Sequence, residues 1–428
     1  MITLRPFDSG ESPHLDVLSD KVNGIHSILT FKEGVIVRIR TMNQIHEDAI
    51  QFLQDAEHLV RHDVINPDAL LVRSAKVSEE DLKSATAISR SGAGVNNIPV
   101  DFCSDKGIVV FNTPGANANA VKELVIASLI IVSRNIMPAT HWVKDAAHYS
   151  AKRPEKDLSE MVEKEKKYFV GREIQGATLG VIGLGNIGRE VATAAQYLGM
   201  KVVAYDPYSS LEFIPNGIRI CEDLDELLEK SDYITLHVPS NEKTRGMINW
   251  NAVKKMKEEV FLLNFSRGDL IDEDAVINCD KIVGYVTDFP SERLVIKDKV
   301  IAMPHIGAST FESEAKCAIT AAKDLDAYLR EGEITHSVNY PTVLLDSLKS
   351  GESRILIHSD LDAPVKEESS WYFDQVCSCN KYKVESYVKE SNKYTVVQVW
   401  GADRKSINEF SLFVLGISTG RIKNVRVI

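Results

Sequence analysis

The chain has 428 residues, 44% of them hydrophobic and 26% charged, which allows two or three domains with substantial cores and argues against overall disorder. A formal net charge of −11 disfavours nonspecific binding to nucleic acid, so an anionic ligand requires a local basic site. No window supplies the roughly 18 unbroken apolar residues of a membrane span, the first residues lack a signal-peptide pattern, and the six cysteines are scattered, so we expect a cytoplasmic protein with free thiols and no metal site.

The first part of the chain alternates short apolar runs with helical patterns. A helix is expected over residues 43–59, and Ser78 followed by Asp81 predicts the capped start of another over 78–83. The apolar runs predict strands over residues 35–39, 69–72, 87–90 and 108–111. Strands that alternate with helices predict a small doubly wound parallel sheet.

Residues 177–208 read as a strand, a glycine-rich turn, a helix and a second strand. The expected strands are 179–182 and 201–205, and the expected helix is 186–198. Gly183, Gly185 and Gly188 form G-x-G-x-x-G, in which glycines allow a tight bend and a close approach of the backbone to a pyrophosphate. The helix start offers N–H groups to phosphates, and Asp206 can accept hydrogen bonds from a ribose diol. The pattern predicts a dinucleotide-binding site.

The rest of the chain continues the rhythm of strands and helices. Long apolar helices are expected over 120–132 and 311–329, and residues 141–168 carry mixed charges typical of a solvated surface helix or loop. Other elements expected before residue 341 are strands over 233–237, 260–264, 281–286 and 300–302 and a helix over 251–257. After a linker, strands over 354–357, 382–388, 395–399 and 424–428 and helices over 368–377 and 407–416 predict a ferredoxin-like unit.

Several sequence blocks between about residues 70 and 341 resemble those of the D-2-hydroxyacid dehydrogenase family. They are VRSAKVSEEDL, SGAGVNNIPVD, NTPGANANAVKELVIA, TLGVIGLGNIG, LHVPSNEKTRGMI, NFSRGDLID and MPHIGAST. The resemblance implies an α/β protein in which a Rossmann NAD-binding domain (118–304) is inserted in a flavodoxin-like substrate-binding domain (1–117 and 305–341). It also implies that residues 352–428 form a C-terminal ferredoxin-like, ACT-like regulatory α+β domain.

Three residues match the family's catalytic set. Arg267 follows a strand and can hold a substrate carboxylate through two parallel hydrogen bonds. His305 is expected to act as general acid and base, because an imidazole titrates in the range needed to take the proton of the substrate hydroxyl. Glu292 is expected to pair with His305, although Arg293 follows it where the family usually has proline.

The resemblance implies NAD as the cofactor. A carboxylate at Asp206 repels a 2′-phosphate, which favours NAD over NADP. The family often has Asp-Val-Phe where this chain has Thr287-Asp288-Phe289, so Asp288 is the expected partner of the nicotinamide amide and Thr287 is the alternative. The cofactor-binding residues implied in this way are Gly183, Gly185, Asn186, Ile187, Gly188, Asp206, His237, Val238, Pro239, Phe265, Ser266, Arg267, Asp288, His305, Ile306, Gly307 and Ala308.

The resemblance also implies a substrate site. Arg73, Ser74 and Asn117 match positions that reach the phosphate in family members acting on phosphoglycerate, and Gly94 and Val95 would offer backbone N–H groups to the carboxylate. The expected reaction is NAD-dependent oxidation of 3-phospho-D-glycerate to 3-phosphohydroxypyruvate, the first step of serine biosynthesis. The alternatives are reduction of glyoxylate, hydroxypyruvate or another small 2-keto acid, and a nucleotide-sensing protein like the family's corepressors.

Assembly and regulation are expected from the same resemblance. A homodimer or homotetramer is expected, with a small-molecule substrate and no nucleic-acid or membrane partner. ACT domains that bind serine carry a His-x-x-x-Pro-Gly turn after the first strand. Here the turn runs from His358 to Pro364, is longer and lacks the glycine, so whether serine binds is left open.

Overall fold

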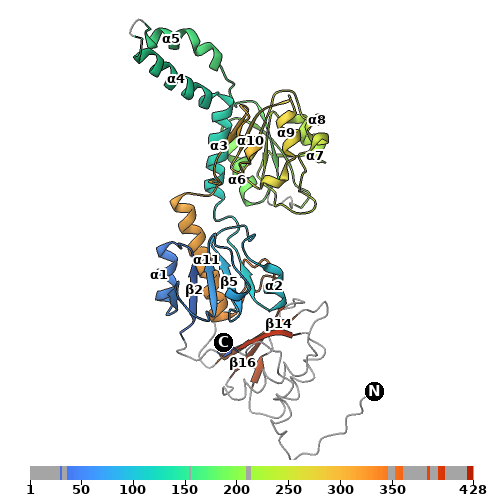
Figure 1. Ribbon diagram of the computed structural model, residues 1–428. Helices are drawn as coiled ribbons and strands as arrows, with labels where there is room; N and C mark the ends of the chain where they lie inside the picture. Colours follow the sequence, from blue (N-terminus) through green and yellow to red (C-terminus); the bar gives the residue numbers. More distant parts are fainter. Residues whose placement is uncertain are drawn as a thin grey trace, which may run out of the picture. The chain divides into compact units, whose positions relative to one another are not determined.

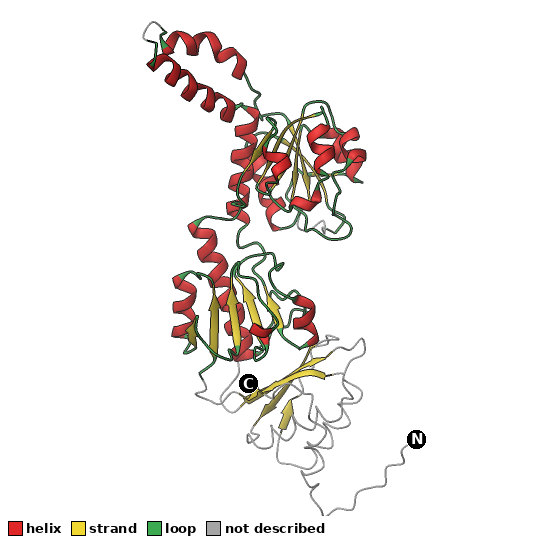
Figure 2. Ribbon diagram, viewed as in Figure 1, coloured by secondary structure: helices red, strands yellow, loops and turns green. Residues whose placement is uncertain are grey.

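The computed structural model describes residues 36–153, 156–208 and 214–345 and, outside them, five strands: Leu29–Thr30, Glu352–Ser359, Lys383–Glu385, Tyr394–Trp400 and Ile422–Val427. The chain forms two compact units. One joins the chain up to Thr113 to the chain from Cys317, and the other runs from Pro114 to Lys316. Figure 2 shows strands flanked by helices in both units.

The first unit contains a parallel sheet in the order β3-β2-β4-β5-β6. In chain order this is 2-1-3-4-5, the flavodoxin-like arrangement expected from the resemblance. Its strands are β2 (Arg38–Met42), β3 (Leu59–Arg61), β4 (Ala69–Val72), β5 (Ala87–Arg90) and β6 (Val109–Phe111), and its helical elements are α1 (Glu47–Asp55), η3 (Glu80–Leu82), α2 (Val100–Asp105) and the end of α11 (Phe311–Glu331).

Helices cover both faces of this sheet, so its central strands are buried (Figure 1). On one face α1 and α11 pack against Ile39 and Leu71. On the other face Leu82 and Cys103 pack against Leu70 and Val72. Burial on both faces explains why β4 reads as an unbroken apolar run and why its predicted bounds are confirmed.

The helix predicted from Ser78 is wrong in type and length. The cap itself forms, because Ser78 Oγ lies 2.6 Å from Asp81 Oδ2 and Ser78 N–H donates to the same oxygen over 2.9 Å. Only one 3₁₀ turn, η3, follows. The chain must enter β5 at Ala87, so no room remains for a second turn.

The second unit is built on a parallel sheet in the order β13-β12-β11-β10-β7-β8-β9. The chain order 7-6-5-4-1-2-3 contains the Rossmann order, with the reversal between β7 and β10. Its strands are β7 (Thr178–Ile182), β8 (Lys201–Tyr205), β9 (Arg219–Ile220), β10 (Tyr233–Leu236), β11 (Val260–Asn264), β12 (Ile282–Thr287) and β13 (Val300–Ala302). Its helical elements are α3 (Ala118–Ser133), α4 (Ile136–Ala151), α5 (Leu158–Glu165), η4 (Lys166–Phe169), α6 (Asn186–Tyr197), α7 (Leu224–Lys230), α8 (Trp250–Lys255), η6 (Gly268–Leu270), α9 (Glu273–Asn278), α10 (Glu292–Val295) and the start of α11.

Two apolar cores hold this sheet. Val121, Val125 and Leu129 of α3 pack with residues of α6 on one face, and residues of α7, α8 and α9 pack on the other. The charged segment 141–168 forms most of α4, all of α5 and part of η4, as expected for solvated helices. α5 buries no side chain and α4 buries only Ala146.

A third sheet combines strands from the two ends of the chain. β14 (Glu352–Ser359) pairs antiparallel with β16 (Tyr394–Trp400) and β17 (Ile422–Val427), and β15 (Lys383–Glu385) pairs antiparallel with β16. β1 (Leu29–Thr30) adds a parallel edge beside β17 that the sequence patterns did not predict. The helices expected over 368–377 and 407–416, and the turn up to Pro364 beyond β14, lie outside the described residues.

Candidate active site

The glycine-rich turn has the geometry for which its three glycines were expected. Gly183 has φ +94°, and a Cβ there would lie 2.6 Å from the backbone oxygen of His237. A Cβ on Gly188 would lie 1.9 Å from the oxygen of Gly183, whereas a Cβ on Gly185 would meet nothing within 4 Å. The turn is therefore closed on its strand side and open at Gly185, where α6 begins, as close approach of a pyrophosphate requires.

Asp206 lies beside this turn, at the end of β8. Its Oδ2 accepts from the N–H of Leu184 over 2.8 Å, and its Oδ1 accepts from the N–H of Tyr208 over 2.9 Å. These bonds fix the carboxylate next to the glycine turn. This is where the ribose diol of a dinucleotide is bound in the fold.

His237 lines the other side of the turn. Its Cβ lies 3.5 Å from the position of a Cβ on Gly188, and its Nε2 is 3.0 Å from Oγ1 of Thr235. Burial lowers the pKa of His237 to about 3, so the ring is neutral at physiological pH. Its Nδ1 is buried and has no partner among the described residues.

Arg267 is held at the end of β11 by a buried amide. Asn264 Nδ2 donates to the backbone oxygen of Arg267 over 2.8 Å, and Asn264 Oδ1 accepts from the N–H of Ser266 over 3.1 Å. Ser266 Oγ donates to the oxygen of Leu236 over 2.9 Å, which ties this turn to β10. Sequence reasoning missed Asn264. The signal that could have revealed it is a single asparagine in an otherwise apolar strand.

His305 adopts a left-handed backbone conformation, with φ +46°. Its N–H donates to the backbone oxygen of Asp288 over 2.9 Å, and its ring centroid lies 4.7 Å from that of Phe289. Asp288 Oδ2 accepts from the N–H of Gly307 over 2.8 Å. Asp288 is 1% exposed, and burial raises the pKa of its carboxyl, while the charges of His305 and Arg267 oppose that shift.

The structure does not bring Glu292 to His305. Glu292 is the exposed first residue of α10, and no hydrogen bond or ion pair joins it to His305 in the part of the chain that is described. Arg293, in the place of the family's proline, pairs instead with Asp274 of α9. Thr287 uses its Oγ1 to accept from the N–H of Phe289 over 3.0 Å.

In the first unit, Arg73 lies directly after β4. Its backbone oxygen accepts from Nε of Arg90 over 3.0 Å, and the N–H of Ser74 donates to Oδ1 of Asn43 over 3.2 Å. Gly92 has φ +147°, and a Cβ there would lie 2.5 Å from Nη1 of Arg90. The guanidinium of Arg90 therefore lies over the turn that leads to Gly94 and Val95. Sequence reasoning missed Arg90, although it ends a strand beside the strand that precedes Arg73.

Asn117, the third residue assigned to the phosphate, belongs to the second unit and precedes α3. Its side chain makes no capping hydrogen bond, and its Oδ1 is buried without a partner among the described residues. An acceptor left without a donor can accept a hydrogen bond from a ligand hydroxyl, but not from a phosphate dianion, which has no hydrogen to donate.

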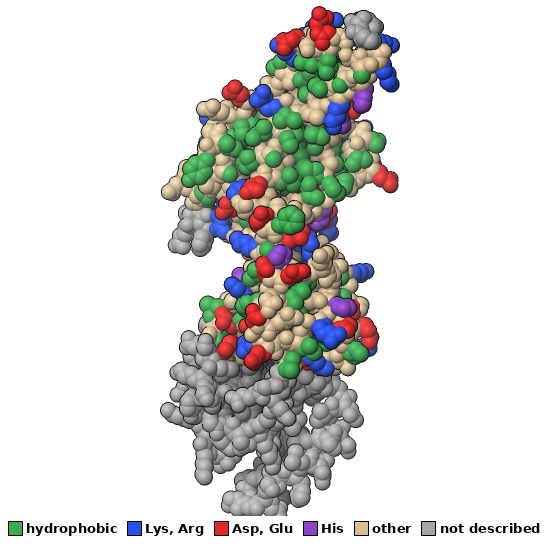
Figure 3. Space-filling model, turned by 90° about the vertical axis from the view of Figure 1, so that its left-hand side faces the viewer, with side chains coloured by type: hydrophobic (Ala, Val, Ile, Leu, Met, Phe, Trp, Pro, Cys, Tyr) green, Lys and Arg blue, Asp and Glu red, His purple; other side chains and the backbone are tan. Residues whose placement is uncertain are grey.

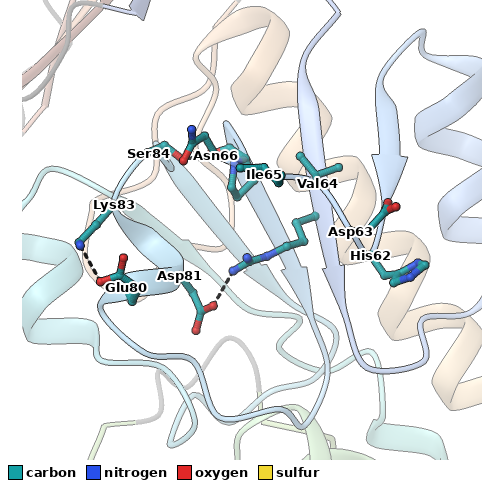
Figure 4. A pocket seen from close by; sticks show the side chains of 11 residues that line it. His62, Asp63, Val64, Ile65, Asn66, Glu80, Asp81, Lys83 and Ser84 are labelled. Carbon is teal, nitrogen blue, oxygen red and sulfur yellow. Dashed lines mark hydrogen bonds and ion pairs between the residues drawn. The ribbon is translucent and has the colours of Figure 1, made fainter.

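A pocket of about 360 Å³ in the first unit contains none of the site residues named above. Figure 4 shows its lining between residues 62–67 and 80–84, where Arg40 pairs with Asp81 over 2.6 Å and Lys83 pairs with Glu80 over 2.6 Å. Because these charges are already paired with one another, we do not assign the active site to this pocket. The described residues hold no group of three or more His, Cys, Asp or Glu suited to a metal, and no described helix meets the length and hydrophobicity of a membrane span.

The second unit fits a bound NAD. The turn is open at Gly185, the acid Asp206 stands beside it, and the neutral His237 offers an unpartnered ring nitrogen. Residues 126–307 match the profile described as "D-isomer specific 2-hydroxyacid dehydrogenase, NAD binding domain".

Comparisons over longer stretches agree. The chain is 36% identical over 310 residues to a hydroxypyruvate reductase of Thermotoga maritima, which covers 66% of this chain and 95% of that protein. The chain belongs to the D-isomer specific 2-hydroxyacid dehydrogenase family. It is also 35% identical over 338 residues to the D-3-phosphoglycerate dehydrogenase of Methanocaldococcus jannaschii, of whose length it spans 61%, with 73% of this chain covered. A crystal structure of NAD⁺-bound 3-phosphoglycerate dehydrogenase from Entamoeba histolytica is similar with a TM-score of 0.58 and 28% identity, covering 72% of this chain and 99% of that one.

Proposed function

We propose that the protein oxidises 3-phospho-D-glycerate to 3-phosphohydroxypyruvate with NAD, the first step of serine biosynthesis. The observation that carries this proposal is the pair of arginines at the carboxyl ends of β4 and β5. Arg73 and Arg90 supply two guanidinium groups in a protein whose net charge is −11. A dianionic phosphate needs a basic site of its own beside the one that Arg267 gives to the carboxylate, whereas an unphosphorylated 2-hydroxy acid needs only the latter.

In this proposal, residues of the second unit carry out the chemical step. Arg267 would hold the carboxylate and polarise the neighbouring C2 oxygen. His305 would take the hydroxyl proton from that oxygen while the hydride leaves C2. When bound, the nicotinamide ring supplies the acceptor for that hydride. Asp206 would bind the adenosine ribose, where a 2′-phosphate is repelled by its charge.

Reduction of hydroxypyruvate or glyoxylate is the second candidate. The Thermotoga relative named hydroxypyruvate reductase matches this chain over 95% of its own length, which favours this reading. The two candidates differ in the phosphate, so Arg73 and Arg90 separate them. We also propose, from the family resemblance alone, that Glu292 pairs with His305 during catalysis.

We also propose a homodimer and an ACT-like C-terminal domain. Apolar side chains gather on one face of the second unit (Figure 3), and Met137, Val143 and Tyr149 of α4 are each more than 40% exposed. Such side chains on an extended helix suit a contact with a second copy. The order β17-β14-β16-β15, all antiparallel, is the strand order of a ferredoxin-like sheet and supports the ACT-like reading.

A substrate panel tests the proposed reaction. NADH formation would be followed with 3-phosphoglycerate, and NADH consumption with hydroxypyruvate and glyoxylate, each as kcat/KM at one pH. We expect the highest value with 3-phosphoglycerate. A higher value with hydroxypyruvate or glyoxylate would favour the second candidate, and no turnover of any of them would refute both proposed reactions.

A further inference from the structure

In the segment Thr287-Asp288-Phe289, the aspartate and the threonine before it belong to different faces of the sheet. Successive side chains of a strand point to opposite faces. Tyr285 packs in the core beneath α7 to α9, and Val286 packs in the core beneath α3. The side chain of Thr287 is therefore on the same face of the sheet as that of Tyr285, and the side chain of Asp288 is on the same face as that of Val286. Gly307 lies close to both: a Cβ on Gly307 would be 3.0 Å from Oδ2 of Asp288 and 3.9 Å from Cγ2 of Val121, which packs in the core beneath α3.

Asp288 contacts both sides of the turn that carries His305. Its backbone oxygen accepts from the N–H of His305 over 2.9 Å, and its Oδ2 accepts from the N–H of Gly307 over 2.8 Å. A Cβ on Gly307 would lie 3.0 Å from that same Oδ2, so the carboxylate fits closely against the turn. Phe289 completes the enclosure through its ring contact with His305.

His305 needs such support because of its backbone. A non-glycine residue with φ near +46° occupies an unfavourable region of backbone space and persists there only where surrounding contacts impose it. The two hydrogen bonds to Asp288 lie on either side of this residue. A valine in place of Asp288 keeps the backbone bond and loses the bond to Gly307.

We propose that Asp288 is a positioning residue, which fixes the turn from His305 to Gly307 so that the imidazole is held ready to take the substrate proton. This inference rests on the proposed dehydrogenase function and assigns the carboxylate to the turn instead of to the nicotinamide amide. The Oδ1 atom of Asp288 is buried and has no partner among the described residues, so the hydrogen bond from Gly307 to Oδ2 is the side-chain bond that ties this carboxylate to the turn.

Three variants separate the two roles of Asp288. Asp288→Val removes the bond to Gly307, Asp288→Asn keeps an oxygen that can accept it, and the double variant Thr287→Asp with Asp288→Val restores the family's order. We expect Asp288→Val to lower kcat by about tenfold to a hundredfold, because a poorly positioned imidazole loses part of the roughly 10²–10⁴-fold that general acid–base catalysis typically contributes. KM for NAD should change by less than about threefold. Asp288→Asn should recover most of the loss, and the double variant should not, because Asp at 287 faces away from Gly307.

Amide hydrogen exchange at Gly307, measured without cofactor or substrate, gives a readout that is independent of activity. Exchange should be slow in the wild type and Asp288→Asn and faster in Asp288→Val. Asp232→Asn is the matched control, because Asp232 Oδ2 also accepts from a backbone N–H, that of Thr178 over 2.7 Å, before β10 in the same sheet. It should leave Gly307 exchange and kcat unchanged.

The outcomes distinguish the inference from the proposed function. A rise in KM for NAD that matches the fall in kcat, or recovery in the double variant, would show a nicotinamide contact and overturn the inference. Unchanged exchange at Gly307 in Asp288→Val would also overturn it. An inactive wild type with the expected exchange pattern would refute the proposed reaction and support the fixed turn.

Discussion

The N–H of Gly307 donates to the buried carboxylate of Asp288 over 2.8 Å, two residues beyond His305. This bond joins the end of β12 to the turn before α11, although 19 residues separate the two partners. It holds an ionisable carboxyl group against the turn that carries the proposed general base, His305. The stability of the protein should therefore depend on pH through Asp288.

Asp288→Asn should stabilise the protein as pH rises. Burial raises the pKa of Asp288 above its ordinary value of 3.8, so the folded state binds this proton more tightly than the unfolded state. The contribution of Asp288 to the free energy of unfolding is therefore fully present at pH values below the ordinary pKa and is lost as pH rises through the pKa of the folded state. The difference in Tm between variant and wild type should grow between pH 4 and pH 8 in thermal unfolding. Asp232→Asn should show the opposite trend, because hydrogen bonds from Lys257 and Thr178 outweigh burial and lower the pKa of Asp232.

Asp206→Ala should weaken NAD binding. The variant removes the proposed acceptor of the ribose diol, and a hydrogen bond to a charged group contributes about 1.5–3 kcal/mol, so KM for NAD should rise roughly tenfold or more with a smaller change in kcat. Activity with NADP relative to NAD should increase, since the repelling charge is gone. An unchanged KM for NAD would remove the ribose assignment.

His305→Asn should lose most turnover while NADH still binds. General acid–base groups typically contribute about 10²–10⁴-fold, and the amide cannot take up a proton. NADH fluorescence titration would measure binding and stopped-flow absorbance would measure turnover. Glu292→Gln should lose less, because Glu292 is exposed and does not contact His305. Equal losses in the two variants would show that Glu292 reaches the ring during catalysis.

Arg73→Ala and Arg90→Ala should damage activity selectively. Losing one charged hydrogen bond to the phosphate should lower kcat/KM for 3-phosphoglycerate by roughly tenfold to a hundredfold and leave activity on an unphosphorylated 2-hydroxy acid nearly unchanged. Arg40→Ala is a suitable control, because Arg40 pairs with Asp81 in the same unit. Equal loss on both substrates would indicate a structural or carboxylate-binding role, and no loss would contradict the phosphate assignment.

Asp326→Asn should destabilise the first unit near neutral pH. Burial opposes ionisation of Asp326, but hydrogen bonds from His58 (2.8 Å) and Arg330 (2.9 Å) prevail and lower its pKa. The stabilisation is therefore present at neutral pH and is lost as pH falls through the folded-state value. We expect a loss of about 1–3 kcal/mol in denaturant unfolding at pH 7 and a smaller loss at pH 3. Asp63→Asn, at the exposed pair with Arg61, should change little.

The sequence by itself determined the elements whose signals are local. The strands at 69–72, 87–90, 201–205, 260–264 and 300–302 have the predicted bounds. They are buried parallel strands or end at a clear turn, so apolar runs mark them. The glycine turn lies between β7 and α6 and Asp206 directly follows β8, because their spacing along one strand–turn–helix–strand unit fixes where they lie.

Tertiary structure alone decided which distant side chains meet. Arg90 lies beside Arg73 because β4 and β5 are neighbours in register, and Asp288 meets Gly307 because β12 ends where the turn of His305 begins. The same packing left Glu292 exposed and limited the Ser78 cap to one 3₁₀ turn. Hydrogen bonds between residues far apart in the chain depend on strand register and turn geometry, which residue patterns confined to one segment do not encode.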